Sequence, residues 1–174
     1  MKFNLKKLTV AGMLVALTVT FSTFCIPVGA AKCYPIQHVV NVLAAVFLGP
    51  VYGVIMAFCT SLIRNILGTG SLLAFPGSMI GAFLAGFLYQ KSGKLVLAYL
   101  GEVIGTGIIG GILCYPVATF LMGKEAALFM YVIPFLASTM VGTFIAFVMI
   151  SALYKSKAFN YLKQILEGTT FKKI

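Results

Sequence analysis

Long apolar runs separated by short polar breaks make up most of the chain. A helix needs about 20 residues to cross the hydrocarbon core of a bilayer, so the length allows six crossings with short links. The pattern predicts an all-α membrane protein, a six-transmembrane-helix bundle. In chain order, the predicted spans are about 8–26, 36–48, 51–67, 76–89, 95–121 and 127–154. Together they form a membrane domain at 1–155, followed by a basic amphipathic cytoplasmic tail at 156–174.

The stretch 68–86 combines a break with a new helix start. Gly68 and Gly70 interrupt the preceding helix, and Pro76 suits the first turn of the next one. Small residues then recur at every fourth position, at Gly77, Gly81 and Ala85. This spacing lets another helix approach closely inside a bilayer. A break beside an exposed helix N-terminus is a common way to build a binding site in a membrane protein.

Composition supports a multi-pass protein of the cell membrane. Apolar residues are 61% of the chain, charged residues 9%, and mean hydropathy is +1.07, whereas a soluble domain carries roughly 25% charge. The net charge of +10 does not indicate a nucleic-acid partner, because the lysines stand at segment ends. With both termini in the cytoplasm, ten of the thirteen basic residues fall inside, as the positive-inside rule favours. Lys32, Arg64 and Lys124 then lie at or near the outer surface.

The first segment resembles a secretory signal because it has a basic start and an A-x-A-like motif at Val28-Gly29-Ala30. Its apolar run is longer than that of most signal peptides, so we expect it to stay in the protein. The four cysteines form no CxxC pair. Cys25 and Cys33 flank one loop and could form a disulfide, but small apolar filler is the favoured interpretation.

Polar residues gather at the predicted outer ends of segments two to five, where they could line a binding site. The candidate substrate-binding residues are Tyr34, His38, Asn41, Arg64, Asn65, Ser71, Phe75, Ser78, Glu102 and Tyr115. The alternative is that outer helix ends are wet and polar in any membrane protein.

Arg64 and Glu102 are the two charged residues for which the sequence leaves the role open. Glu102 lies about seven residues from the inner end of its segment, roughly 10 Å deep, so a direct pair with Arg64 is not expected. Arg64 either snorkels outward or points into the cavity. Glu102 is a ligand group, a proton-linked residue or a structural hydrogen-bond acceptor.

Several chemistries are excluded or disfavoured. The chain has one histidine and no aspartate, so neither a metal site nor an aspartyl protease is expected. It has no P-loop and no HExxH motif, and Gly77–Gly81 is not a nucleophile elbow. A Ser78–His38 dyad stays a remote alternative. The prediction is a protein that is not an enzyme and needs no cofactor.

Segment one carries small residues at every fourth position, Gly12, Ala16 and Thr20. Such a face packs either within the same bundle or against another membrane protein. The second interpretation makes it a partner-docking surface.

Taken together, several motifs resemble the substrate-binding (S) component of an energy-coupling factor (ECF) vitamin transporter, most closely the ThiW branch. The motifs are the Gly12-xxx-Ala16 face, Pro35-Ile36-Gln37-His38-Val39-Val40-Asn41, Leu48-Gly49-Pro50 with Ser61-Leu62-Ile63-Arg64, Leu73-Ala74-Phe75-Pro76-Gly77-Ser78, and Gly101-Glu102-Val103-Ile104-Gly105-Thr106-Gly107. The resemblance covers about residues 5–155. One departure is Gly12, where S components typically have alanine.

The resemblance implies a bundle that binds one small vitamin precursor near the outer face, for this branch hydroxyethylthiazole. It implies that segment one docks on a transmembrane coupling protein that carries two cytosolic ATPases. The chain has no Trp, so Tyr, Phe or His would have to stack on the thiazole ring. Two alternatives stay open: an S component for another thiamine precursor or water-soluble vitamin, and a solitary proton-coupled carrier that uses Glu102.

Overall fold

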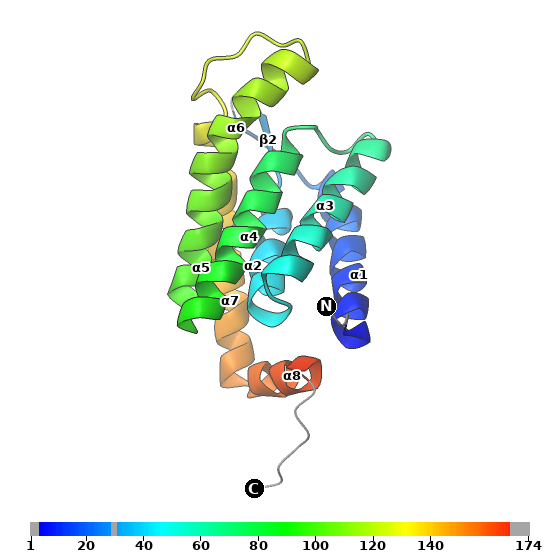
Figure 1. Cartoon of the computed structure of the whole chain (residues 1–174), viewed down its shortest axis with the longest axis vertical. Helices are drawn as coiled ribbons and strands as arrows, with labels where there is room; N and C mark the ends of the chain where they lie inside the picture. The colour runs from blue at the N-terminus through cyan, green and yellow to red at the C-terminus, as the bar shows by residue number, and fades with distance from the viewer. Residues whose placement is uncertain (1–3, 29–30, 168–174) are drawn as a thin grey trace, which may run out of the picture.

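The computed structural model of the chain describes residues 4–28 and 31–167, and these form an upright bundle of helices (Figure 1). The helices are α1 (Leu5–Thr20), α2 (Pro35–Phe47), α3 (Pro50–Ile66), α4 (Ala74–Ser92), α5 (Leu95–Glu102), α6 (Gly111–Pro116), α7 (Val132–Lys155) and α8 (Ala158–Glu167). A 3₁₀ turn, η1 (Phe21–Thr23), extends α1. The π-helical segment η2 (Val103–Gly110) joins α5 to α6, and a second one, η3 (Val117–Leu121), extends α6, so that they form one rod.

Three helical stretches are long and apolar enough to cross a membrane: Leu5–Thr23, Leu95–Leu121 and Val132–Lys155. Two shorter apolar helices, Pro35–Phe47 and Pro50–Ile66, lie beside them. The predicted helical membrane architecture is therefore confirmed, and the rod at Leu95–Leu121 has the predicted bounds.

The break between the first two helices was predicted without regular structure, but it contains a short antiparallel hairpin. Strand β1 (Ile26–Val28) pairs with β2 (Ala31–Cys33), with Ile26 opposite Cys33. The pairing satisfies backbone groups of a segment that cannot continue either helix. Residues 29 and 30 of the A-x-A-like motif lie outside the described residues. Cys25 and Cys33 are both free, so the structure contains no disulfide between them.

The last long helix, α7, begins at Val132, later than the predicted position near residue 127. Residues 128–131 instead form turns. Pro134 therefore lies in the first turn of α7, where backbone N–H groups have no partner within the helix, so its missing N–H group costs no hydrogen bond. This placement removes the kink that a proline inside the helix would produce.

Helix α4 packs very closely on the Leu95–Leu121 rod, as the small residues of α4 predicted. A Cβ atom added to Gly105 would lie 2.8 Å from the Cα of Gly81, and one added to Gly110 would lie 2.5 Å from the Cα of Gly77. Glycines on both helices thus let the two backbones touch. This contact fixes the position of Glu102 and Thr106 relative to α4.

The tail begins with α8, which lies across the lower end of the bundle (Figure 1). Phe159 and Leu166 of α8 are buried against the bundle. Asn4 at the start of α1 donates a hydrogen bond from Nδ2 to the carbonyl oxygen of Leu166, 2.9 Å away. Helix α8 therefore caps the end of the bundle that carries the start of α1. Residues 168–174 of the predicted tail lie outside the described residues.

Candidate substrate-binding site

A wide hollow opens at the end of the bundle opposite α8, and we call it the vestibule. The hairpin, the α3–α4 loop and the segment before α7 line it, with Lys32, Asn65, Ser71 and Lys124 among its residues. Its empty volume is about 1480 Å³, part of it open to solvent.

A smaller hollow, the inner pocket, continues from the vestibule into the bundle, with an empty volume of about 350 Å³, part of it open to solvent. Gln37 and His38 of α2, Ser78 of α4, Thr106 of η2 and Ser138 of α7 line it. Lys32, Tyr34, Ala74 and Phe135 line both hollows, so they form the boundary between them. Two of these four are aromatic, and Tyr34 and Phe135 offer ring surfaces to a ligand that passes inward.

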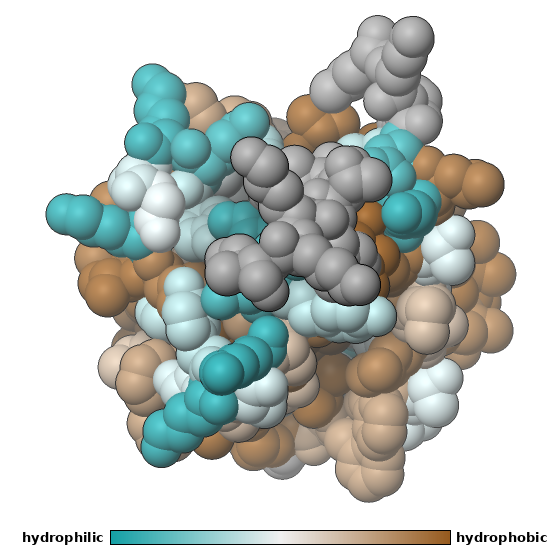
Figure 2. Space-filling view, turned by 90° about the horizontal axis from the view of Figure 1, so that it is seen from below, coloured by the Kyte–Doolittle hydropathy of each residue, from teal (hydrophilic) through white to brown (hydrophobic). Residues whose placement is uncertain are grey.

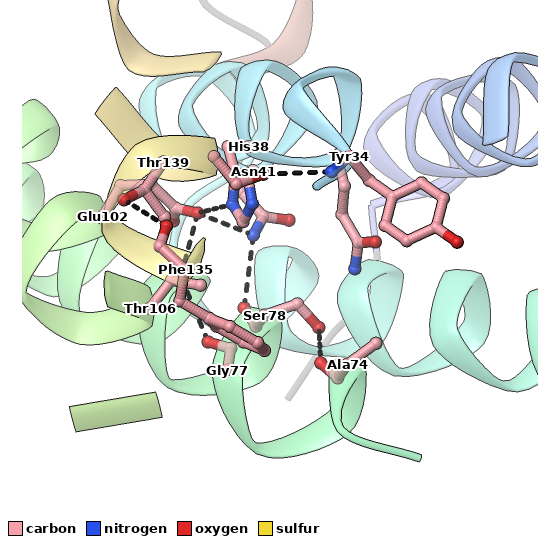
Figure 3. Close-up of polar contacts among 12 residues, drawn as sticks. Tyr34, His38, Asn41, Ala74, Gly77, Ser78, Glu102, Thr106, Phe135 and Thr139 are labelled. Carbon is pink, nitrogen blue, oxygen red and sulfur yellow. Dashed lines mark hydrogen bonds and ion pairs between the residues drawn. The ribbon is translucent and has the colours of Figure 1, made fainter. Parts of the chain in front are cut away.

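A buried hydrogen-bond network centred on Glu102 lies beneath the inner pocket (Figure 3). The Oε1 atom of Glu102 lies 2.9 Å from Nδ1 of His38, 3.0 Å from Nδ2 of Asn41 and 3.0 Å from Oγ1 of Thr106. Asn41, Glu102 and Thr106 are each at most 1% exposed. The network therefore joins α2 to the rod. Oε1 of Glu102 thus lies within hydrogen-bond distance of side chains from both sides of this junction.

The network sets the proton position on His38. Because Nδ2 of Asn41 donates to Oε1, that oxygen acts as an acceptor, and Nδ1 of His38 carries the hydrogen. A neutral imidazole with hydrogen on Nδ1 has a free lone pair on Nε2. His38 also lines the inner pocket, so its ring offers an acceptor to a ligand hydroxyl there.

Gly81 provides the space that Glu102 occupies. A Cβ atom added to Gly81 would overlap Oγ1 of Thr106 and would lie 2.7 Å from Oε2 of Glu102. Thr106 stands in the π-helical segment η2 and also lies 3.1 Å from the carbonyl oxygen of Gly77. π-Helical turns recur at functional sites, where they re-aim side chains. The small residues of α4 thus leave space for the side chains of the hydrogen-bond network and also allow close helix packing.

Arg64 points inward and does not snorkel. It is 1% exposed, and its guanidinium carbon lies 3.9 Å from the centroid of the Tyr34 ring. One terminal nitrogen donates to the side-chain oxygen of Gln37, and the other donates to the carbonyl oxygen of Thr69 at 3.3 Å. Arg64 therefore holds the Tyr34 ring by a cation–π contact. As expected, it forms no ion pair with Glu102, whose carboxyl group instead contacts the His38 ring.

Several buried polar atoms around the inner pocket have no hydrogen-bond partner within the described residues. They are Nε2 of Gln37, Oδ1 of Asn41, Nε of Arg64 and Oε2 of Glu102. Native proteins pair most buried polar groups, because each unpaired one costs about 1–3 kcal/mol. Gln37 lines the inner pocket, so a polar ligand there would pair its amide. The cluster of unpaired atoms is consistent with a pocket that binds a polar ligand.

The structure brings most of the predicted site residues together. Tyr34, His38 and Ser78 line the inner pocket, and Asn65 and Ser71 line the vestibule. Asn41, Arg64 and Glu102 contact the lining residues through the bonds described above. The side chain of Asn65 also closes the α3–α4 loop, since its Nδ2 donates to the carbonyl oxygen of Ser71 at 3.1 Å.

Two predicted residues lie apart from these hollows. Phe75 and Tyr115 line neither the vestibule nor the inner pocket. The Phe75 ring packs 5.7 Å from that of Phe58, which is exposed on the outside of α3. The backbone of Tyr115 accepts a hydrogen bond from Oγ1 of Thr119 at 3.0 Å.

Seven residues that line the inner pocket were not among the sequence candidates: Lys32, Gln37, Ala74, Thr106, Pro134, Phe135 and Ser138. Two of them carried a usable signal. Gln37 directly precedes His38, and Thr106 stands four residues after Glu102, so the two side chains share a helix face. Ser138 anchors the hairpin end, because its Oγ accepts a hydrogen bond from the backbone nitrogen of Tyr34 at 3.0 Å.

The small-residue face of α1 lies on the outside of the bundle. Gly12, Ala16 and Thr20 are all exposed, whereas Ala11 and Thr18 of the same helix are buried. A Cβ atom added to Gly12 would meet nothing within 4 Å. The face is therefore not used for packing within the described part of the chain.

Comparisons with known proteins agree with this geometry. The model of a family described as thiamine-precursor transporter protein (ThiW) matches residues 8–156. Among solved structures, the S component of a bacterial ECF transporter matches with a TM-score of 0.72 and 21% sequence identity, over 86% of this chain and 96% of that chain. At this identity the match shows the fold. Comparison with curated proteins gives no significant match.

Proposed function

The chain belongs to the ThiW family of thiamine-precursor transporter proteins, and from this premise we propose that it captures hydroxyethylthiazole in the inner pocket. This molecule is small, aromatic and carries one hydroxyl group. The family is one of transporters and not of enzymes. The substrate-binding residues in this proposal are those that line the two hollows or bond to the lining.

The observation that carries the proposal is the contact between His38 and Glu102. It leaves Nε2 of His38 as an acceptor beside the inner pocket, where the hydroxyl of the substrate can donate to it. Tyr34 and Phe135 stand at the entrance and supply ring surfaces for the thiazole. Unpaired Nε2 of Gln37 supplies a donor for the ring nitrogen.

The same proposal assigns the remaining parts of the chain. Six crossings place both termini in the cytoplasm and the vestibule outside, with residues 1–155 in the membrane and 156–174 at its inner surface. The exposed face formed by Gly12, Ala16 and Thr20 docks on the ECF transmembrane coupling protein, which works with two cytosolic ATPases. The exposure of that face supports this role, because close approach needs small side chains that no neighbour covers.

Binding to the purified full chain in detergent tests the proposal. Hydroxyethylthiazole should bind saturably, with one molecule per chain, and uptake in vesicles should require the coupling protein and ATPases. The family description specifies a thiamine precursor only, so the second candidate is the aminopyrimidine precursor. Saturable binding of that molecule beside no binding of the thiazole would replace the first candidate by the second.

Transport without the ATPases would favour the solitary proton-coupled carrier instead. That alternative needs a carboxyl group that exchanges protons during transport. Glu102 is fully buried and its Oε1 is bonded to three neighbours, which fits a structural acceptor better. A pH-driven flux that Glu102→Gln abolishes, measured with the chain alone in liposomes, would overturn the importer assignment.

A further inference from the structure

A third hollow opens at the end of the bundle that α8 covers, far from the vestibule. We call it the lower pocket. It lies where the starts of α1 and α3, the ends of α2 and α4, and helix α8 meet, and its empty volume is about 890 Å³, part of it open to solvent. Seen from this end, hydrophilic residues stand out on the left and upper sides of the molecule, whereas its lower right is hydrophobic (Figure 2). The site proposed above makes no use of this pocket.

Two lysines from opposite ends of the sequence, Lys7 and Lys163, line the lower pocket. Both are half-buried, whereas Lys6, Lys91 and Lys155 at the same end of the bundle are exposed. The Nζ atom of Lys7 donates to the carbonyl oxygen of Leu48 at 3.2 Å, and that of Lys163 donates to the hydroxyl of Tyr89 at 3.1 Å. An ammonium group has three hydrogens, so each lysine can donate further hydrogen bonds to a ligand in the pocket.

No acidic side chain lines the lower pocket, and within the described residues neither lysine forms an ion pair. The neighbours of the two lysines, a backbone carbonyl and a phenol, are neutral. The first turn of α3 also opens into the pocket through Gly49, Pro50 and Val51, and a helix start favours negative charge. The pocket thus concentrates positive charge in a partly closed space and selects an anion.

The surroundings select a lipid over a soluble anion. Val51 lines the pocket and is also the first residue of an exposed apolar row along α3, which continues through Ile55, Phe58 and Leu62. These positions share one face of the helix. A headgroup in the pocket would therefore place its acyl chains along this row. Basic pockets between helix ends at the cytoplasmic side bind the headgroups of anionic lipids.

We propose that the lower pocket binds the headgroup phosphate of an anionic phospholipid, held between Lys7 and Lys163. The lipid joins the start of α1, the α2–α3 turn and α8 at the lower end of the bundle. This site is separate from substrate capture, and its function does not depend on the identity of the vitamin precursor.

Native mass spectrometry of the full chain, titrated with phosphatidylglycerol, phosphatidylcholine or inorganic phosphate, tests this site. We expect bound phosphatidylglycerol at lipid concentrations where phosphatidylcholine does not bind. The pair Lys7→Gln and Lys163→Gln should lower the apparent affinity roughly tenfold. The matched pair Lys6→Gln and Lys155→Gln, which removes the same charge from exposed positions, should leave the affinity unchanged.

Equal losses in the two pairs would show that general surface charge attracts the lipid, and they would overturn the site. Displacement of phosphatidylglycerol by millimolar inorganic phosphate would identify a soluble anion as the ligand, which also overturns it. If the pocket pair fails to fold, a photoactivatable phosphatidylglycerol on the unchanged chain decides the question. Crosslinks from the headgroup should fall on residue 7, residues 45–52, residues 89–93 or residue 163, and crosslinks confined to other segments would contradict the proposal. Hydroxyethylthiazole binding is measured on the same samples, so the two proposals fail independently.

Discussion

The imidazole of His38 and the carboxyl group of Glu102 meet inside the bundle, with Nδ1 and Oε1 2.9 Å apart. The contact joins residues 64 positions apart in the sequence, and it connects α2 to the rod at Leu95–Leu121. His38 reaches the inner pocket, whereas Glu102 is fully buried behind it. In the proposed function, Glu102 is therefore a positioning residue, and His38 is the group that meets the substrate.

The change Glu102→Gln tests this division of roles. A glutamine side chain has one oxygen acceptor in place of two. Its NH₂ group would replace either Oε1, which faces His38, Asn41 and Thr106, or Oε2, which lies in the tight space beside Gly81. We expect substrate affinity to fall at least tenfold, since a buried polar group left without its partner costs about 1–3 kcal/mol. Calorimetric titration measures it. Glu125→Gln, the same change at an exposed position near the vestibule, is the control and should bind like the unchanged protein.

Replacing Tyr34 tests the ring at the entrance of the inner pocket. Tyr34→Leu removes the aromatic face that Arg64 holds at 3.9 Å, so we expect affinity for the thiazole to fall roughly tenfold. Tyr34→Phe keeps the ring and should stay within about threefold of the unchanged protein. Equal losses in the two variants, measured by equilibrium binding, would assign the role to the hydroxyl instead of the ring.

Gly81→Ala tests whether α4 provides the space for the network. The added methyl group would overlap the Thr106 hydroxyl and press on Glu102. We expect a loss of thermal stability of about 1–3 kcal/mol, as for other overpacked interiors, together with weaker substrate binding. Gly12→Ala is the matched control, because nothing lies within 4 Å of its added Cβ. A Gly81→Ala protein with unchanged melting temperature and affinity would contradict the packing described here.

The exposed face of α1 is tested by bulky substitutions. Ala16→Phe or Gly12→Leu should abolish co-purification with the coupling protein, since a large side chain keeps the helices apart. Substrate binding by the isolated chain should persist, because the face lies outside the bundle. Leu8→Phe, at another exposed position of α1, controls for a general effect of bulk. Intact assembly of the Ala16→Phe protein would exclude this face as the docking surface.

Local patterns predicted much of the fold. Apolar runs, the breaks at Gly68 and Gly70, and the recurring small residues of α4 each act within one or two helices, and the structure contains the helices and close contact that they indicated. The hairpin after α1 was missed because its pairing joins two strands of three residues each, too short for a periodic signal.

The candidate site was predicted less completely. The sequence pattern identified His38 and Glu102 separately as candidates. Their contact depends on how α2 packs on the rod, and the spacing of residues within one helix does not predict that packing. The direction of Arg64 was left open for the same reason. Its side chain contacts Tyr34, just before α2, and Gln37 in α2, and the sequence does not show that α2 packs beside Arg64. Phe135 and Ser138 were missed because the start of α7 was expected five residues earlier, at 127 and not at Val132.

The most direct test of the account is identification of the small molecule that the full chain retains. The protein is purified after growth with hydroxyethylthiazole, denatured, and the released compound is analysed by mass spectrometry beside the Glu102→Gln protein. We predict about one hydroxyethylthiazole per chain in the unchanged protein and a strongly reduced amount in the variant. Release of a different vitamin or precursor in equal proportion to the chain, with no thiazole, would contradict the assignment.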